Sequence, residues 1–201
     1  MWKLGVIALM LLLVCLTGVV PKAGGQQGPV VTPRQGLSQD EANRDYFTDA
    51  QVITHEGQQL RFYSDILRDK LVLINFFYTN CPTAPPGMAR FFKVQGLLGE
   101  QLGKSVLLVS ISVDPERDTL EALQKYAWKY NPKKGWLFLT GNAEAMDLIN
   151  RRLGNTLRLP EGHLRLFLLG NPRTGHWMKM LESAPPSSIV DGLRSLATET
   201  P

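Results

Sequence analysis

The stretch Leu71-Val-Leu-Ile-Asn-Phe-Phe-Tyr-Thr-Asn-Cys-Pro82 decides the fold of this chain. Its first eight residues form an apolar run that only Asn75 interrupts. Such a run is typical of a central strand that is buried on both faces of a parallel sheet. Pro85 and Pro86 come shortly afterwards, and prolines are tolerated in a helix only within its first turn. The stretch therefore predicts a central strand and a following helix, with Cys81 at the junction between them.

A short hairpin precedes this run, and strands and helices alternate from the run onward. Beyond it the pattern predicts strands at 51–54, 59–63, 106–113, 136–140, 164–169 and 176–180, and helices at 88–102, 119–130, 142–153 and 187–196. Alternation that ends in a hairpin is typical of an α/β sandwich with a mixed central sheet. A cysteine just past the first buried strand, at the start of a helix, lies where the thioredoxin-like fold keeps its active site. The fold class that we predict is therefore a thioredoxin-like α/β sandwich.

The composition excludes several classes of protein. The chain has 201 residues, of which 44% are hydrophobic and 20% charged, and its net charge is +4. These values are ordinary for a globular protein and exclude a wholly disordered chain or a polytopic membrane protein. The charge excess is small and spread out, so we expect no nucleic-acid partner. Two cysteines are too few for a small domain built on disulfides.

The first 20 residues are typical of an export signal or a membrane anchor. Lys3 precedes 17 uncharged residues, Leu4 to Val20, which would form a helix of about 25 Å against a membrane core of about 30 Å. The small residues that a signal peptidase prefers are poorly represented near Val20. We therefore favour a retained hydrophobic helix as anchor, while cleavage stays open. No Arg- and Ser-rich transit peptide is present, which favours a bacterial envelope protein over an organellar one.

This organisation divides the chain into three segments. Residues 1–20 are the signal peptide or anchor, and residues 21–41 form a flexible tether rich in glycine and proline, which cannot build a core. Residues 42–201 form the folded domain, which is long enough to bury a substantial core.

Several stretches of this domain resemble the Sco/SenC family. They are Arg61-Phe-Tyr-Ser-Asp65, Leu71 to Pro82, Val109-Ser-Ile-Ser-Val-Asp-Pro-Glu-Arg-Asp-Thr119, Gly135-Trp-Leu-Phe-Leu-Thr-Gly141 and a histidine, His163, before a strand. The resemblance implies a thioredoxin-like, membrane-tethered protein that handles copper during assembly of cytochrome oxidase. It also implies a domain in the periplasm at the bacterial inner membrane, or a periplasmic or secreted protein if the anchor is cleaved. The expected partner is an oxidase subunit or another copper-handling protein.

The resemblance also implies a metal site, and one of its positions has changed. In the family, copper is held by a C-x-x-x-C pair and a distant histidine. Cys81 matches the first cysteine and His163 the histidine, but Pro85 stands in place of the second cysteine. Thiolate and imidazole donors suit copper, so the expected ligands are Cys81 and His163 in a degenerate site. Cys15 cannot replace the missing thiol, because it lies in the signal segment.

Three interpretations of Cys81 stay open. It is a weakened copper ligand, a one-thiol redox centre of an oxidoreductase or peroxidase, or a buried remnant in a binding scaffold. We favour a metal carrier over an enzyme, because the first interpretation follows the resemblance most directly.

Two other clusters have simpler explanations than chemistry. His176, Met178 and Met180 alternate, which on a strand would form a soft-metal patch, but a half-buried hairpin with core methionines is the favoured interpretation. In the charged stretch from Asp114 to Asp118, we expect an aspartate to cap the next helix and to pair with Arg117, rather than to act as an acid or base.

Overall fold

The computed structural model describes residues 26–27, 36–81, 86–156, 162 and 165–200. The predicted N-terminal helix and two positions of the predicted metal site, Pro85 and His163, lie outside these residues. Within the described ranges, no helix combines the length and the apolar character that crossing a membrane requires.

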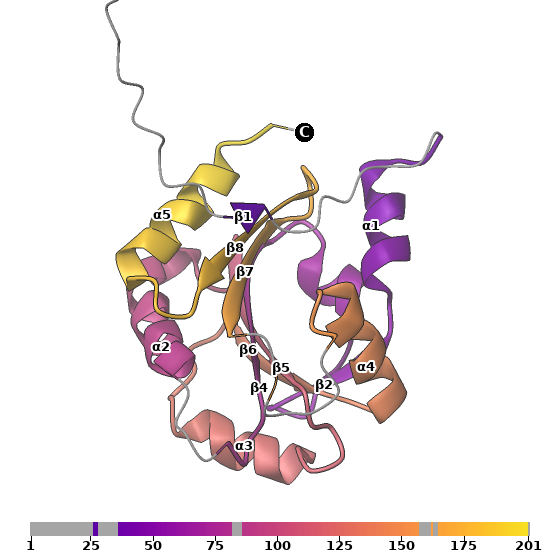
Figure 1. Cartoon of the computed structure of the whole chain (residues 1–201), viewed down its shortest axis with the longest axis vertical. Coiled ribbons are helices and arrows are strands. Elements are labelled where there is room, and N and C mark those ends of the chain that lie inside the picture. Colours follow the sequence, from indigo (N-terminus) through magenta and orange to yellow (C-terminus); the bar gives the residue numbers. More distant parts are fainter. Residues whose placement is uncertain (1–25, 28–35, 82–85, 157–161, 163–164, 201) are drawn as a thin grey trace, which may run out of the picture.

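One mixed sheet of eight strands forms the centre of the molecule (Figure 1). The strands, in sheet order, are β1 (Gln26–Gln27), β8 (His176–Leu181), β7 (Leu166–Asn171), β4 (Leu71–Phe77), β5 (Val106–Ser112), β6 (Trp136–Thr140), β2 (Gln51–Thr54) and β3 (Gln59–Arg61). Strands β4, β5 and β6 run parallel, and their neighbours on both sides are antiparallel. The predicted thioredoxin-like α/β sandwich with a mixed sheet is confirmed.

Helices cover both faces of this sheet (Figure 1). The helices are α1 (Gln39–Phe47), α2 (Pro86–Leu98), α3 (Leu120–Trp128), α4 (Ala143–Arg152) and α5 (Pro186–Ala197), with a 3₁₀ turn at Gly99–Gln101. Residues of α1 and α4 share one buried cluster with alternate residues of the central strands, and residues of α2, α3 and α5 share the other. The central strands are thus buried on both faces, which explains their nearly continuous apolar sequence.

The second strand of the opening hairpin is shorter than predicted. It ends at Arg61, and a π-helix occupies Phe62–Leu67. The carboxylate of Asp65 accepts hydrogen bonds from the backbone N–H of Arg61, at 2.7 Å, and from its guanidinium. This turn buries Phe62 completely instead of leaving it on a strand at the edge of the sheet.

Two elements of the structure begin within the segment 21–41. Gln26–Gln27 pair with β8, and α1 begins at Gln39, three residues before the predicted start of the domain. Ser38 and Glu41 form a capping box at the start of α1, in which each side chain bonds the other residue's backbone N–H. The helix then places Phe47 in the core.

Asn75, the polar residue that interrupts the apolar run at 71–78, lies in a buried polar network. Its amide oxygen accepts a hydrogen bond from Ser110 at 2.7 Å, and its amide nitrogen donates to the sulfur of Met88 at 3.2 Å. The indole N–H of Trp136 donates to the Ser110 hydroxyl at 3.0 Å. Because these groups satisfy one another, the polar side chain is tolerated inside the core.

Candidate metal centre

Cys81 lies just beyond the carboxyl end of β4, where the sequence placed it. Its side chain is half-buried and is not in a disulfide. Its backbone N–H donates to the carbonyl of Tyr78 at 3.4 Å, so the chain turns sharply as it leaves the strand. The carboxyl ends of β5 and β6 lie at the same edge of the sheet, because both strands run parallel to β4. Groups that come after these strands can therefore contact the Cys81 loop.

Asp118 ties this loop to the segment after β5. One of its carboxylate oxygens accepts from the backbone N–H of Thr79 at 2.9 Å and from the Thr79 hydroxyl at 2.6 Å. The other accepts from the Ser112 hydroxyl. Burial raises the pKa of Asp118 above its usual value, while the hydrogen bonds from Ser112 and Thr79 oppose that shift. The loop that carries Cys81 is thus fixed two residues before the thiol.

The expectation of an aspartate cap on α3 is wrong. The cap is Thr119, whose side chain accepts from the backbone N–H of Ala122. Asp118 instead faces the Cys81 loop, and Arg117 pairs with Asp114, with Nε 3.0 Å from a carboxylate oxygen. The aspartate is drawn inward because the buried donors on Thr79 and Ser112 need an acceptor, whereas a helix end exposed to water can use a hydroxyl.

Helix α3 closes the space beside Cys81 with aromatic side chains. The Tyr126 ring stacks on Phe77, with 5.0 Å between ring centroids, and its hydroxyl lies 3.4 Å from that of Tyr130. Burial raises the pKa of Tyr126, Tyr130 raises it further, and nearby Cys81 and Asp118 act in the same direction. The wall beside the thiol is therefore largely apolar, and the Tyr126 hydroxyl in it is neutral.

A buried carboxylate near the start of α2 was not predicted. Glu182 comes directly after β8 and is only 6% exposed, and one of its oxygens has no hydrogen-bond partner among the described residues. A Cβ atom on Gly87, in the first turn of α2, would lie 2.8 Å from that oxygen. Burial raises the pKa of Glu182, which Arg165 and Arg90 oppose. A single acidic residue after a strand carries no sequence signal for such burial.

The second predicted ligand, His163, lies outside the described residues, so its pairing with Cys81 stays a prediction. The structure does describe the chain just after His163. Strand β7 pairs antiparallel with β4, with Ile74 opposite Leu168. Its first residue, Leu166, therefore lies toward the end of β4 that leads to Cys81.

The alternating cluster on β8 is a packing feature. Met178 and Met180 are partly buried against the core beneath α5, and the ring nitrogen Nδ1 of His176 lies 2.7 Å from a carboxylate oxygen of Glu199. No group of three or more His, Cys, Asp or Glu residues in the described ranges could hold a metal ion. The geometry thus supports the core interpretation of these methionines.

Comparison with known proteins identifies the family. The SCO1/SenC family model matches residues 39–161. The SCO1 protein homolog of Bacillus subtilis is 31% identical over 144 residues, which cover 66% of this chain and 74% of that protein. A protein of Stutzerimonas stutzeri, provisionally named as copper-binding, is 30% identical over 94 residues, covering 46% of this chain and 45% of that protein. This chain spans less than half of the length of several curated relatives that it matches.

A solved structure supports the same assignment. BsSco, described as a member of the Sco family of cytochrome c oxidase assembly proteins with a disulfide switch, is 26% identical. It superposes with a TM-score of 0.64 over 75% of this chain and 92% of that one. The family model covers more than half of the sequence, and the matching stretches include the loop before Cys81 and the Asp118 segment that anchors it. The chain belongs to the SCO1/SenC family.

Proposed function

We propose that this protein is a copper carrier for the assembly of respiratory cytochrome oxidase, and that its copper ligands are Cys81 and His163. Copper is its cargo, and the protein is a carrier rather than an enzyme. Family membership supports the role, because relatives are described as copper-binding and as cytochrome c oxidase assembly proteins. Soft Cu(I) prefers a thiolate and an imidazole as donors, which are the groups that this pair supplies.

The observation that carries the proposal is the placement of Cys81 at the edge of the sheet from which β7 begins. The Asp118–Thr79 bonds hold the thiol-bearing loop at the carboxyl end of β4. The chain enters β7 toward the same edge, and His163 precedes Leu166 by three residues. Three residues span at most about 11 Å between Cα atoms. That reach is short compared with the width of the sheet, so it supports a shared site.

Pro85 makes the proposed site a weaker one. With one thiolate in place of two, the ion has fewer soft donors and we expect a lower affinity for Cu(I). A cysteine pair that cycles between dithiol and disulfide is also lost, so copper release cannot be coupled to a disulfide within the site. We infer that an oxidase subunit or another copper-handling protein completes the coordination sphere during transfer.

We also propose that residues 1–20 anchor the chain in the bacterial inner membrane, with the domain in the periplasm. The 17 uncharged residues from Leu4 to Val20 support this placement. In cell fractionation, the full chain should remain in the membrane pellet after carbonate washing, and a variant lacking residues 4–20 should not. Recovery of the intact chain in the soluble fraction would contradict an anchor.

Titration of the full chain with Cu(I), in competition with a chromophoric chelator in mild detergent, tests the metal proposal. We expect one Cu(I) per chain, and at least tenfold weaker binding in Cys81→Ser and in His163→Ala. Matched controls are Cys15→Ser, which removes the other cysteine, and His176→Gln, which removes a histidine that lies against Glu199. Pro85→Cys should strengthen binding, because it restores the second thiolate.

Three results would overturn the proposal. If Cys81→Ser binds copper as tightly as the parent, Cys81 is not a ligand. If the protein ignores copper but Cys81 reacts rapidly with a hydroperoxide or a disulfide, the one-thiol redox interpretation is correct. If neither reaction occurs, the domain is a binding scaffold.

A further inference from the structure

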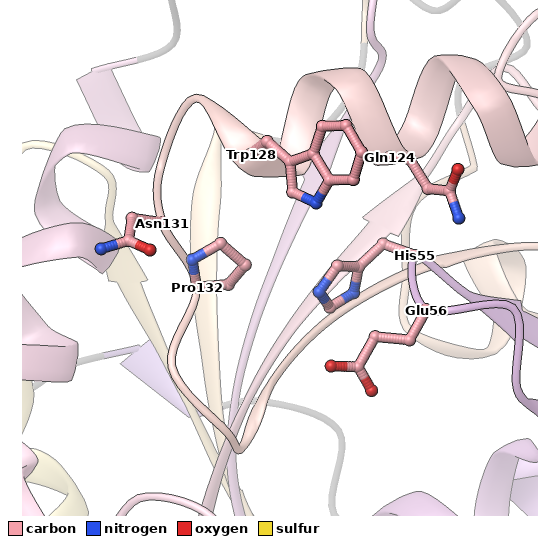
Figure 2. A pocket seen from close by; sticks show the side chains of 6 residues that line it. All are labelled: His55, Glu56, Gln124, Trp128, Asn131 and Pro132. Atoms are coloured by element: carbon pink, nitrogen blue, oxygen red, sulfur yellow. The ribbon is translucent and has the colours of Figure 1, made fainter.

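A hollow of about 500 Å³ lies on the side of α3 that carries Trp128 (Figure 2). Its lining residues come from three places: the turn after β2, helix α3 and the loop before β6. They are His55, Glu56, Gln124, Trp128, Asn131 and Pro132. Gln124 and Trp128 are four residues apart and so share one face of the helix, whereas Tyr126 is buried on another. The hollow is therefore separate from the edge that carries Cys81, and a role for it does not depend on the copper proposal.

His55 is a buried group with one nitrogen directed into this hollow. The residue is 7% exposed, and its backbone N–H donates to the carbonyl of Phe138 at 2.9 Å. The backbone N–H of Phe138 donates in return to Nδ1 of the imidazole, at 3.4 Å. Burial lowers the pKa of His55, which Glu56 partly opposes, so the ring is neutral at pH 7. Because Nδ1 accepts a hydrogen bond, the proton of the neutral ring lies on Nε2.

That Nε2–H is a donor without an acceptor. Among the residues that the structure describes, none bonds to it. Figure 2 shows the imidazole pointing into the space between Trp128, Pro132 and Glu56. A neutral ring with its proton on Nε2 is also a poor metal ligand there, because coordination requires a lone pair on that nitrogen. The hollow thus offers a hydrogen bond to an acceptor rather than a place for a metal ion.

Trp128 supplies the apolar wall of the hollow. Its side chain is 70% exposed, whereas Trp136 and Trp177 are almost completely buried. The indole nitrogen lies on the side of the ring nearer to His55, and the ring of Pro132 lies across from it (Figure 2). An indole is a large, rigid surface with a polar N–H, and such residues are enriched where proteins bind partners. The wall can therefore pack against an apolar ring and donate one more hydrogen bond.

The charge of the hollow restricts its occupant. Among the described residues that line the hollow, Glu56 alone carries a charge, which disfavours an anion and favours a positively charged group beside it. Two N–H donors, from His55 and Trp128, need acceptors that do not carry a full negative charge. Backbone carbonyls of a polyproline II segment fit this need, since that conformation makes no internal hydrogen bonds and its proline rings pack in grooves lined by aromatic residues.

We propose that this hollow binds an extended, proline-containing segment of a partner protein, with a basic residue of that segment beside Glu56. The proline ring packs against Trp128 and Pro132. The Nε2–H of His55 and the indole N–H of Trp128 donate to carbonyl groups of the segment. The site gives the protein a second docking surface, on the opposite side of α3 from the Cys81 edge.

Fluorescence anisotropy of labelled peptides tests this proposal on the full chain. The probe is a blocked hexaproline peptide that ends in arginine amide, and its control replaces the prolines with three Gly-Ser repeats. We expect saturable binding of the proline peptide with a Kd of about 1 mM or tighter, and at least tenfold weaker binding of the control. Glu56→Gln should remove the preference for the arginine-terminated peptide over one that ends in glutamine.

Variants of the lining separate this site from other surfaces. Trp128→Ala and His55→Phe should each weaken binding at least tenfold, whereas Phe92→Ala removes an aromatic ring that is 50% exposed elsewhere and should change nothing. Trp128 is largely exposed, so its removal keeps the test informative even if His55→Phe fails to fold. Three results would overturn the proposal: no saturable binding, equal binding of the Gly-Ser peptide, or unchanged binding by Trp128→Ala. Binding of Zn²⁺ or Cu²⁺ that requires His55 would replace it with a metal site.

Discussion

The two sides of helix α3 differ in the way they use aromatic residues. On the inner side, Tyr126 is 5% exposed and stacks on Phe77 beside the loop that carries Cys81. On the outer side, Trp128 is 70% exposed over a hollow that no described side chain fills. The ring of Tyr126 packs against the rings of Phe77, Tyr130 and Phe138, so it forms part of the wall beside Cys81. The outer ring has little packing to hold it, so its face is available to a partner.

The polar groups on the two sides show the same difference. Near Cys81, both carboxylate oxygens of Asp118 accept hydrogen bonds from the protein. In the hollow, the Nε2–H of His55 has an acceptor on none of the described residues. Satisfied groups fix a loop in one position, whereas an unsatisfied donor at a surface is available to a ligand. Substitutions on each side of the helix can show whether this division of roles is correct.

Replacement of Tyr126 by alanine should have the largest effect on stability. The change removes a buried ring from a well-packed cluster, and we expect the free energy of unfolding to fall by about 3 kcal/mol. Trp128→Ala, two residues away on the same helix, is the matched control and should change it by less than about 0.5 kcal/mol. Urea unfolding followed by circular dichroism measures both. Similar losses for the two variants would mean that the outer ring also serves packing, which would weaken the case for a docking surface.

Replacement of Asp118 by alanine should have the next largest effect. Three donors on Thr79 and Ser112 lose their acceptor in a buried place, and we expect a loss of about 2 kcal/mol. The Cys81 loop is also released, so the affinity for Cu(I) should fall while peptide binding in the hollow stays unchanged. Asp191→Ala, which removes an exposed carboxylate that pairs with Arg194, is the control and should alter neither property. An Asp118 variant with unchanged copper affinity would show that the loop needs no anchor.

Much of the fold follows from the sequence because its strands and helices have strong periodic patterns. The segments 51–54 and 136–140 match β2 and β6, and the continuous apolar run at 71–78 matches β4 to within one residue. Local pattern fails where tertiary contacts decide. In the π-helix after Arg61, the backbone N–H of Ser64 donates to the carboxylate of Asp49, 15 residues earlier, and the pairing of Gln26–Gln27 with β8 joins segments far apart in the chain.

The candidate site shows the same limit. The position of Cys81 was predictable because the loop between a buried strand and the following helix lies at the carboxyl end of that strand. The role of Asp118 was not, since its partner Thr79 lies 39 residues earlier, and spacing within one segment cannot show such a bond. His55 directly follows the predicted strand 51–54, and nothing in the local sequence indicates that the imidazole is buried against Phe138. Functional groups that depend on neighbours from other strands therefore need the structure.

Glu182 provides the prediction with the smallest expected effect. It is a buried carboxylate, and one of its two oxygens has no hydrogen-bond partner among the described residues. Burial raises its pKa in the folded protein above the usual value of 4.5, which the unfolded chain keeps. The folded state therefore binds the proton more tightly, and its stability falls as pH rises from about 4.5 through the folded pKa. Glu182→Gln removes this charge, so we expect about 1 kcal/mol more stability at pH 7 and a shallower decline between pH 4.5 and pH 7.

Urea unfolding of the parent and of Glu182→Gln at several pH values measures the difference. Glu100→Gln is the matched control, because its carboxylate is 93% exposed and should leave the pH dependence unchanged. If Glu182→Gln is less stable than the parent at pH 7, the Glu182 carboxylate is hydrogen-bonded in the folded protein. Its charge at the start of α2, beside the Cys81 loop, would then stabilise the fold. In that case the contrast with Asp118 disappears, because both carboxylates would then hold the inner edge in place.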